Sequence, residues 1–142
     1  MKWFFLGLSL ILFSCDKRYL NVKRERVDRF SLASSYVNSP DPLQTRPPLG
    51  QRLLIEWRLP LSSVKKGLIL TLHVIYRNNS EAYFHYPIEK HNGSATYELL
   101  GDEFLLKKGL LSYQATVRNF QGDLIKEWTQ ALYVQLIEPS SL

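Results

Sequence analysis

Few side chains in this chain of 142 residues have the chemistry of a catalytic or metal-binding site. The chain has one cysteine, Cys15, and three histidines, His73, His85 and His91. His85, Glu89 and His91 are close enough in sequence to meet at a turn, but a zinc site needs three or four converging ligands. The alternative is that His73 lies on a strand face, His85 on the surface and His91 in a turn. We favour this alternative and expect neither a metal nor another cofactor.

The sequence patterns that mark common enzyme sites are missing. No Gly-x-Ser-x-Gly nucleophile motif occurs, and neither phosphate-binding loop, Gly-x-x-x-x-Gly-Lys or Gly-x-Gly-x-x-Gly, is present. Asp102 and Glu103 are adjacent, so in an extended chain they point to opposite faces. Glycoside hydrolysis needs two carboxylates held across a cleft at a set distance, and this arrangement does not favour such a pair. The sequence predicts a protein that is not an enzyme.

The N-terminus has the pattern of an export signal. An uncharged run of eleven residues, 3–13, follows the positive start Met1-Lys2. The run is shorter than the roughly 20 residues that a helix needs to span a bilayer. A short apolar run behind a positive start is typical of a secretory signal peptide. The longest later apolar stretch, 67–76, is also too short to cross a membrane.

The end of this run carries a second signal. It reads Leu12-Phe13-Ser14-Cys15 and resembles the lipobox of bacterial lipoproteins, in which a Leu, a small residue and a Gly, Ala or Ser precede Cys. Leu12, Ser14 and Cys15 match this pattern, whereas Phe13 departs from it. The resemblance implies that a peptidase cuts between Ser14 and Cys15, and that Cys15 carries a thioether-linked diacylglycerol. Palmitate would then label the protein.

A lipid on Cys15 would hold the protein on a membrane of the bacterial cell envelope, on the periplasmic side or at the outer membrane, without a spanning helix. Two or three acyl chains anchor firmly, because each buried methylene contributes about 0.8 kcal/mol. The alternatives are a plain signal peptide with an incidental cysteine and an uncleaved signal anchor.

Charge is uneven along the chain. The whole sequence has 18 Lys and Arg against 13 Asp and Glu, and residues 16–29 alone hold six basic residues against three acidic ones. Such a basic segment beside a lipid anchor would be attracted to anionic headgroups. The alternative is a solvated, flexible spacer. Nucleic acid is not an expected partner, because the basic run has neither interleaved aromatic residues nor a folded face.

Composition and the positions of proline and turn residues divide the chain into four parts. We expect a lipoprotein signal peptide at 1–14 and a lipidated, basic, Pro-rich tether at 15–49, with a candidate edge strand at 30–37. A β-sandwich domain is expected at 50–138, and a C-terminal tail at 139–142. Proline excludes a helix interior in the tether and favours extended or turn geometry there.

From Gln51 onward, apolar residues recur at every second position, which is the period of β-strands. The alternation predicts strands over 51–59, 68–76, 82–88, 95–100, 104–106, 111–118 and 124–137, with turns at 78–79 and 91–94. No helical periodicity follows the leader. We therefore predict an all-β fold, an immunoglobulin-like antiparallel β-sandwich of about seven strands, preceded by an N-terminal signal helix and a flexible tether.

The segment 106–117 resembles the penultimate strand of immunoglobulin-like and fibronectin type III domains. There, as here, a Leu and a Gly precede a Tyr, and small or branched residues alternate after it. The resemblance implies that Tyr113 is the corner tyrosine, with its hydroxyl bonded to upstream backbone near 106–108. Trp57 or Trp128 would fill the middle of the core. The paired core cysteines of antibody domains are absent, so the resemblance is to the wider sandwich class.

Aromatic side chains cluster on neighbouring predicted strands. Alternation sends some of them to the core and others outward, and an exposed row of Tyr on a sheet could bind a sugar or a partner strand. The alternative is that aromatic residues are simply good strand formers. The candidate binding residues are Tyr83, His85 and Tyr97.

Two classes of function follow from these observations. The first is a lipid-anchored envelope protein that presents a non-enzymatic binding or scaffolding module to a protein partner. The second is a small envelope enzyme, or a carbohydrate- or ligand-binding protein, with its site in the end loops of the sandwich. The lack of an enzyme-site motif favours the first.

Overall fold

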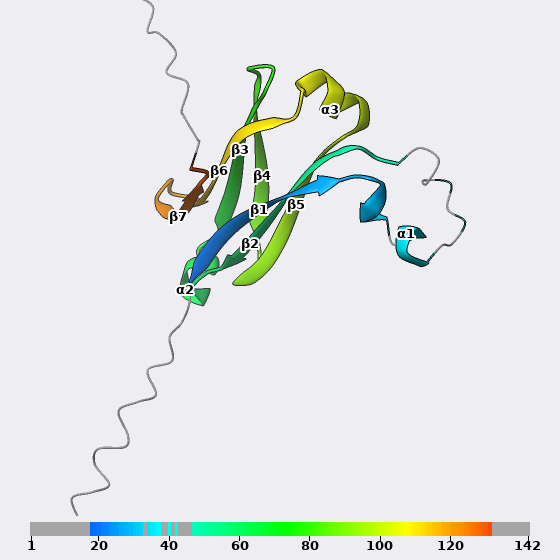
Figure 1. Ribbon diagram of the computed structural model, residues 1–142. Helices are drawn as coiled ribbons and strands as arrows, with labels where there is room; N and C mark the ends of the chain where they lie inside the picture. The colour runs from blue at the N-terminus through cyan, green and yellow to red at the C-terminus, as the bar shows by residue number, and fades with distance from the viewer. Residues whose placement is uncertain (1–17, 33, 38–39, 41, 43–46, 132–142) are drawn as a thin grey trace, which may run out of the picture.

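The fold is built from two antiparallel β-sheets packed face to face (Figure 1). The structure is a computed structural model and describes residues 18–32, 34–37, 40, 42 and 47–131. One sheet has three strands in the order β1-β2-β5: β1 (Tyr19–Val27), β2 (Gly50–Arg58) and β5 (Asn92–Leu100). The other has four strands in the order β4-β3-β6-β7: β3 (Leu68–Tyr76), β4 (Glu81–Ile88), β6 (Leu110–Asn119) and β7 (Leu124–Thr129). These sheets confirm the prediction of a mostly β architecture with two sheets.

Alternation along the strands places one set of side chains between the sheets. The predicted strands over 51–59, 68–76, 82–88, 95–100 and 111–118 are confirmed as β2, β3, β4, β5 and β6. On β3 the other face is also well covered, since His73 and Ile75 are buried there. This matches the expectation of a central strand that is covered on both sides. The inward side chains form one core that includes Leu53, Ile55, Trp57, Leu70, Leu72, Val74, Tyr97, Leu99, Tyr113, Ala115 and Val117.

The interpretation of 15–49 as a tether is wrong for its first part, because β1 lies there. β1 pairs antiparallel with β2 over its whole length, from Tyr19 opposite Arg58 to Val27 opposite Gly50. Leu20 and Val22 enter the core, while the charged residues between and after them make the segment look like a spacer in sequence. Charged side chains are a common feature of edge strands, where they discourage pairing with another sheet. The sandwich therefore begins at Tyr19.

The candidate edge strand at 30–37 is also wrong, because the described part of this segment is helical. A 3-10 turn, η1, spans Arg29–Ser31, and a short helix, α1, spans Ser34–Val37. Asp28 caps η1: its side chain accepts from the backbone N–H of Phe30 at 2.9 Å, and its own N–H donates to the Ser31 hydroxyl at 3.1 Å. Such reciprocal capping stabilises a helical start over an extended chain.

The short strand predicted at 104–106 is a helix, α3 (Gly101–Lys107), that follows β5 directly. The acidic residues of its first turn and Lys107 in its last turn complement the helix dipole. The helix ends at Lys107; the next residue, Lys108, has a left-handed backbone with φ 60°, and Gly109 follows with φ 92°. The turn expected at 91–94 is likewise shorter than predicted, because β5 already begins at Asn92.

Two further elements complete the description. Helix α2 (Leu61–Val64) connects β2 to β3, and β7 lies beside β1 along one side of the sandwich. The predicted last strand, 124–137, begins as expected, and β7 ends at Thr129. Residues 132–142, with the expected inward positions Leu132, Val134 and Leu136, lie outside the described residues, as does the whole leader with its predicted signal helix.

Candidate functional site

The three predicted binding residues do not share one surface. Tyr83 and His85 alternate outward on β4, and the Tyr83 side chain is 57% exposed. Tyr97 points the opposite way, into the core, with only 7% of its surface accessible. The prediction that Tyr97 is a surface binding residue is therefore wrong. Tyr97 and Leu99 are two residues apart on β5, so both side chains point to the same face, which is the core. The site that remains is the outward face of the four-stranded sheet.

Strand register arranges this face in two rows that cross the sheet. One row contains Tyr83, His73, Gln114 and Thr129, and the next contains His85, Thr71, Thr116 and Glu127. We call these eight residues the four-stranded outer face. They combine one tyrosine ring with hydroxyl, amide, imidazole and carboxylate groups, and among these residue types tyrosine is enriched at protein interfaces.

A stack of two rings lies on β3 and β4, at one edge of the four-stranded outer face. The His73 and Tyr83 rings lie parallel, with centroids 4.2 Å apart and an interplanar angle of 1°. His73 Nε2 is 2.8 Å from Glu81 Oε2. His73 is buried although it points outward, since Tyr83 covers it on one side. Because the Glu81 carboxylate holds the His73 ring in place, the exposed Tyr83 ring stacks on a fixed support.

Hydrogen bonds fix most of the other side chains on this face. Thr71 Oγ1 lies 3.0 Å from His85 Nδ1. The Gln114 amide donates to Glu127 Oε1 at 2.9 Å and to the Thr129 hydroxyl at 3.2 Å. Side chains that are already ordered lose less conformational entropy when a partner binds. The face is therefore suited to binding without rearrangement.

The outward face of the three-stranded sheet has a different chemistry. Arg52 contacts Glu98 through Nε at 2.8 Å and through a terminal nitrogen at 2.7 Å, and Lys23 contacts Glu25 at 3.0 Å. The Arg52 and Glu98 side chains are each more than a third exposed. Exposed ion pairs of this kind contribute at most about 1 kcal/mol and are screened by salt. This face is a solvated, charge-paired surface.

A pair of buried tyrosines joins the two sheets from inside. The Tyr76 hydroxyl on β3 and the Tyr97 hydroxyl on β5 lie 2.7 Å apart. Burial raises the pKa of both phenols above the ordinary tyrosine value, which favours their neutral forms further. The sequence carries no local signal for this pair, because its members are 21 residues apart and lie in different sheets. The pair lies in the core and links β3 to β5.

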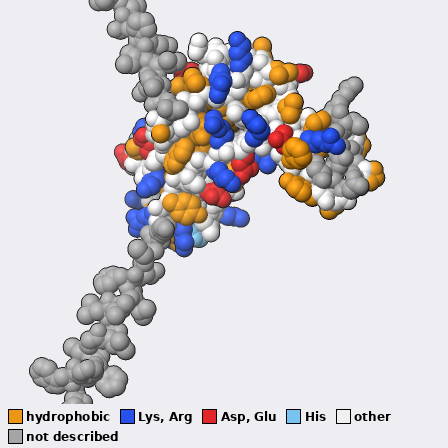
Figure 2. Space-filling model, in the orientation of Figure 1, with side chains coloured by type: hydrophobic (Ala, Val, Ile, Leu, Met, Phe, Trp, Pro, Cys, Tyr) orange, Lys and Arg blue, Asp and Glu red, His pale blue; other side chains and the backbone are white. Residues whose placement is uncertain are grey.

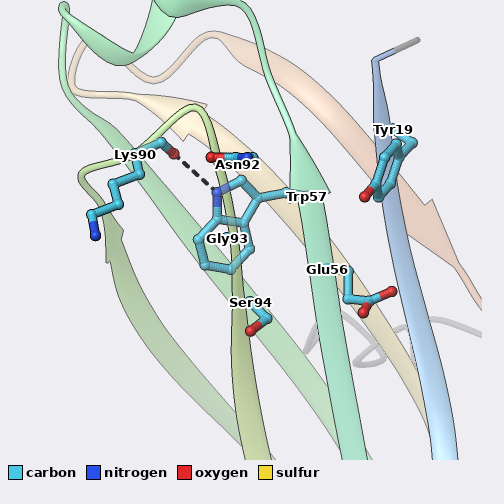
Figure 3. Close-up of a pocket in the computed structure, with 7 residues that line it drawn as sticks. All are labelled: Tyr19, Glu56, Trp57, Lys90, Asn92, Gly93 and Ser94. Atoms are coloured by element: carbon cyan, nitrogen blue, oxygen red, sulfur yellow. Dashed lines mark hydrogen bonds between the residues drawn. The ribbon is translucent and has the colours of Figure 1, made fainter.

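A shallow hollow lies beside Trp57, where β2 ends and β5 begins (Figure 3). The Trp57 indole donates to the Lys90 carbonyl at 3.1 Å and lies against Gly93. A Cβ atom at position 93 would come within 2.8 Å of the ring, so Trp57 can pack here only because residue 93 is glycine. The hollow measures about 510 Å³ and is lined by Tyr19, Glu56, Trp57, Lys90, Asn92, Gly93 and Ser94.

The predicted core residues are found inside, but the predicted tyrosine corner is wrong. Tyr113 is buried, and its ring stacks on Trp128 with centroids 5.6 Å apart. Among the described residues no side-chain hydrogen bond joins its hydroxyl to the backbone of 106–108, and that segment belongs to α3 and the turn after it. The Arg24 guanidinium partly opposes the rise that burial causes in the pKa of Tyr113. Trp57 is the more deeply buried of the two predicted core tryptophans.

The remaining predictions concern metals and the anchor. Within the described part of the chain, no three His, Cys, Asp or Glu side chains come together as metal ligands. His85 is exposed on β4, and His91 is exposed before β5. Ser14 and Cys15 lie outside the described residues. None of the described helices is both long enough and apolar enough to cross a bilayer.

Comparison with known proteins adds no relative. No protein-family model, curated protein or solved structure matches this chain.

Proposed function

We propose that the protein is a lipid-anchored lipoprotein of the bacterial cell envelope that presents a non-enzymatic β-sandwich to a protein partner. The observation that carries the proposal is the position of the lipobox-like segment Leu12-Phe13-Ser14-Cys15, which ends four residues before Tyr19, the first residue of β1. A diacylglycerol on Cys15 would attach the folded module to the membrane with almost no spacer. Confinement beside a membrane raises the effective concentration of a module for partners on the same surface.

The four-stranded outer face is the proposed contact surface for that partner. Tyr83 offers an exposed aromatic ring on a fixed support, and tyrosine is enriched among the residues that dominate binding energy in protein interfaces. The eight residues lie side by side across four adjacent strands, and a surface this broad suits a protein partner better than a small molecule, which is usually held in a cleft. A protein partner is therefore favoured over an enzyme substrate.

The fold is proposed to be immunoglobulin-like in its connectivity. Immunoglobulin domains pair strands A, B and E in one sheet and C, F and G in the other, and some add a strand beside C. The orders β1-β2-β5 and β4-β3-β6-β7 correspond to A-B-E and to C′-C-F-G. This agreement supports the class independently of the tyrosine corner.

Replacing the proposed lipid-bearing thiol tests the anchor. In the Cys15→Ala variant, palmitate labelling should disappear, and the protein should leave the membrane fraction or accumulate as an unprocessed precursor. Ser9→Ala in the same leader keeps the lipobox-like residues and should keep the label. Unchanged labelling of the Cys15→Ala variant would refute the anchor.

A second candidate function, a ligand-binding site in the end loops, has one observation in its favour. The hollow beside Trp57 has a volume within the roughly 300–1,000 Å³ range of ligand pockets. Against it, the Trp57 indole N–H already has a partner and its ring is almost covered, so little of it remains for a ligand. Native mass spectrometry of the purified protein separates the candidates, because a bound small molecule would favour the hollow.

A further inference from the structure

One end of the sandwich combines basic charge with exposed apolar side chains. This end, which we call the α2 end, consists of residues 18–19, 58–67, 88–92 and 118–124. Register brings these segments together: Tyr19 pairs with Arg58, and Leu68 pairs with both Ile88 and Asn119. In Figure 1, α2 and the start of β1 lie at the lower end of the molecule, and the β6–β7 loop lies above them on the left.

The opposite end has a balanced charge. This α3 end consists of residues 27–32, 47–50, 76–81 and 100–109, and it holds four Lys and Arg against four Asp and Glu. The α2 end holds six Lys and Arg against two Asp and Glu. Figure 2 shows Lys and Arg side chains gathered where α2 lies, and Arg58, Lys65, Lys66 and Lys90 are exposed there. The excess of positive charge therefore belongs to one end of the fold.

Apolar side chains are exposed within the same end. Leu61 on α2 is 58% exposed, and Phe120 in the β6–β7 loop is 72% exposed. A Cβ atom on Gly67 would overlap the Phe120 ring, so this ring lies over Gly67, the residue that follows Lys66 in the chain. Tyr19 adds an aromatic ring with a polar tip. Basic residues mixed with Leu, Phe and Tyr are typical of surfaces that bind at the headgroup level of a bilayer.

The proposed anchor fixes which end meets the membrane. Four peptide steps separate Cys15 from Tyr19, and a fully extended chain covers at most about 3.6 Å per residue, or roughly 14 Å in all. The headgroup region itself occupies roughly 5–8 Å of that distance. The α2 end must then lie within about one Debye length, roughly 8 Å, of the lipid surface, where charge attraction is not fully screened.

We propose that the α2 end docks on an anionic phospholipid surface, with Leu61 and Phe120 at the headgroup level and Lys65 and Lys66 against lipid phosphates. This inference rests on the proposed Cys15 anchor. Docking would orient the sandwich, so that the four-stranded outer face stands to the side of the membrane rather than against it.

Matched thiols in the lipidated, full-length protein test the docking. Cys15 is the only native cysteine and would be blocked by lipid, so an introduced cysteine would be the only free thiol. Leu61→Cys places it at the α2 end, and Leu106→Cys, at a leucine that is 72% exposed, places it at the α3 end. The probe is a charged, membrane-impermeant maleimide, applied to protein reconstituted in phosphatidylcholine vesicles with and without phosphatidylglycerol.

The expected result is protection at one end only. Each basic residue near an anionic surface contributes about a fivefold factor to binding, so the Leu61→Cys thiol should react roughly tenfold more slowly than the Leu106→Cys thiol in anionic vesicles. The two rates should become similar in detergent. When Lys65→Gln and Lys66→Gln are added to the Leu61→Cys variant, the ratio of docked to undocked protein on anionic vesicles should fall roughly 30-fold. The matched pair Arg77→Gln and Lys108→Gln, exposed at the α3 end, should leave the ratio unchanged.

Palmitate labelling of the same samples separates the two hypotheses. Equal reactivity of the two thiols in a protein that carries the label would overturn docking and leave the anchor intact. Absence of the label would overturn the anchor and docking together.

Discussion

The two outward faces of the sandwich satisfy their polar groups in different ways. On the three-stranded sheet, Arg52 and Glu98 pair as exposed charges, and water can replace either partner. On the four-stranded sheet, the His73 ring is buried under Tyr83 and held by Glu81, and the Gln114 amide bonds two neighbours. The first arrangement keeps a surface soluble, whereas the second fixes side chains in place.

This difference indicates which face is prepared for a partner. An exposed aromatic residue normally loses rotamer freedom on binding, which costs about 0.5–1.5 kcal/mol for a flexible side chain. The stack on His73 removes part of that cost for Tyr83 before any partner arrives. The Arg52–Glu98 pair would instead have to lose its water on binding, which is unfavourable for charges that are already paired.

The largest expected loss of stability comes from replacing one of the two core tryptophans, which lie in different sheets. Trp57→Ala should lower the free energy of unfolding by about 3–5 kcal/mol, because it empties a buried site of the three-stranded sheet. Trp128→Ala should cost less, since Trp128 is only partly buried on the last strand of the other sheet. Arg58→Ala, at an exposed neighbour of Trp57, is the control and should cost little. Chemical denaturation measures all three, and equal losses for Trp57→Ala and Arg58→Ala would contradict the register of β2.

A second comparison uses two buried tyrosines with different hydroxyl environments. Tyr97→Phe removes the bond that joins the sheets and leaves the Tyr76 hydroxyl without its partner, which should cost about 1–3 kcal/mol. Tyr113→Phe keeps the stack on Trp128 and removes a hydroxyl with no bond to residues 106–108, so its cost should be smaller. Denaturant midpoints of the two variants test this order. A larger loss for Tyr113→Phe would restore the tyrosine corner.

The same pair of phenols predicts a loss of stability in alkali. Burial raises the pKa of Tyr76 and Tyr97 in the folded state, whereas the unfolded chain has the ordinary value of about 10. Between these values the folded state binds more protons, so stability is full below about pH 10 and falls as the pH rises further. The free energy of unfolding, measured from pH 8 to pH 11, should decline less steeply in the Tyr76→Phe/Tyr97→Phe double variant. A decline as steep as that of the parent protein would exclude these phenols as the cause.

The smallest expected change in stability comes from the ion pair on the outward face of the three-stranded sheet. Arg52→Ala and Glu98→Ala should each change stability by about 1 kcal/mol or less, and added salt should shrink the difference. A double-mutant cycle on the two positions measures their coupling energy. A coupling of several kcal/mol that persists in high salt would mean that this face is as well ordered as the opposite one.

The sequence predicts the strands well where alternation is strong. β2 and β3 each place several large aliphatic residues at every second position, so their faces can be assigned without a structure. β1 buries only Leu20, Val22 and Val27, among charged residues, and its partner strand β2 lies 23 to 39 residues further along the chain. Local periodicity cannot detect such a strand, so the sequence alone predicts a tether in this segment.

The candidate site was only partly predictable for the same reason. Alternation on β4 separates Tyr83 and His85 from Phe84 and Tyr86, and this separation is confirmed. The inward direction of Tyr97, the stack of Tyr83 on His73 and the Tyr76–Tyr97 bond all depend on register between strands. Register is a tertiary property, set by how the inward faces meet.

The most direct test of the account is site-specific photocrosslinking on the two outward faces of the membrane-bound protein. A photoreactive amino acid replaces Tyr83 on the four-stranded outer face or, as a matched control, Glu98 on the charge-paired face. We predict one discrete crosslinked protein from position 83, lost when Cys15→Ala removes the anchor, and no such product from position 98. Products that are absent from position 83, or equal from both faces, would contradict the proposal that this lipid-anchored module binds a partner through its four-stranded outer face.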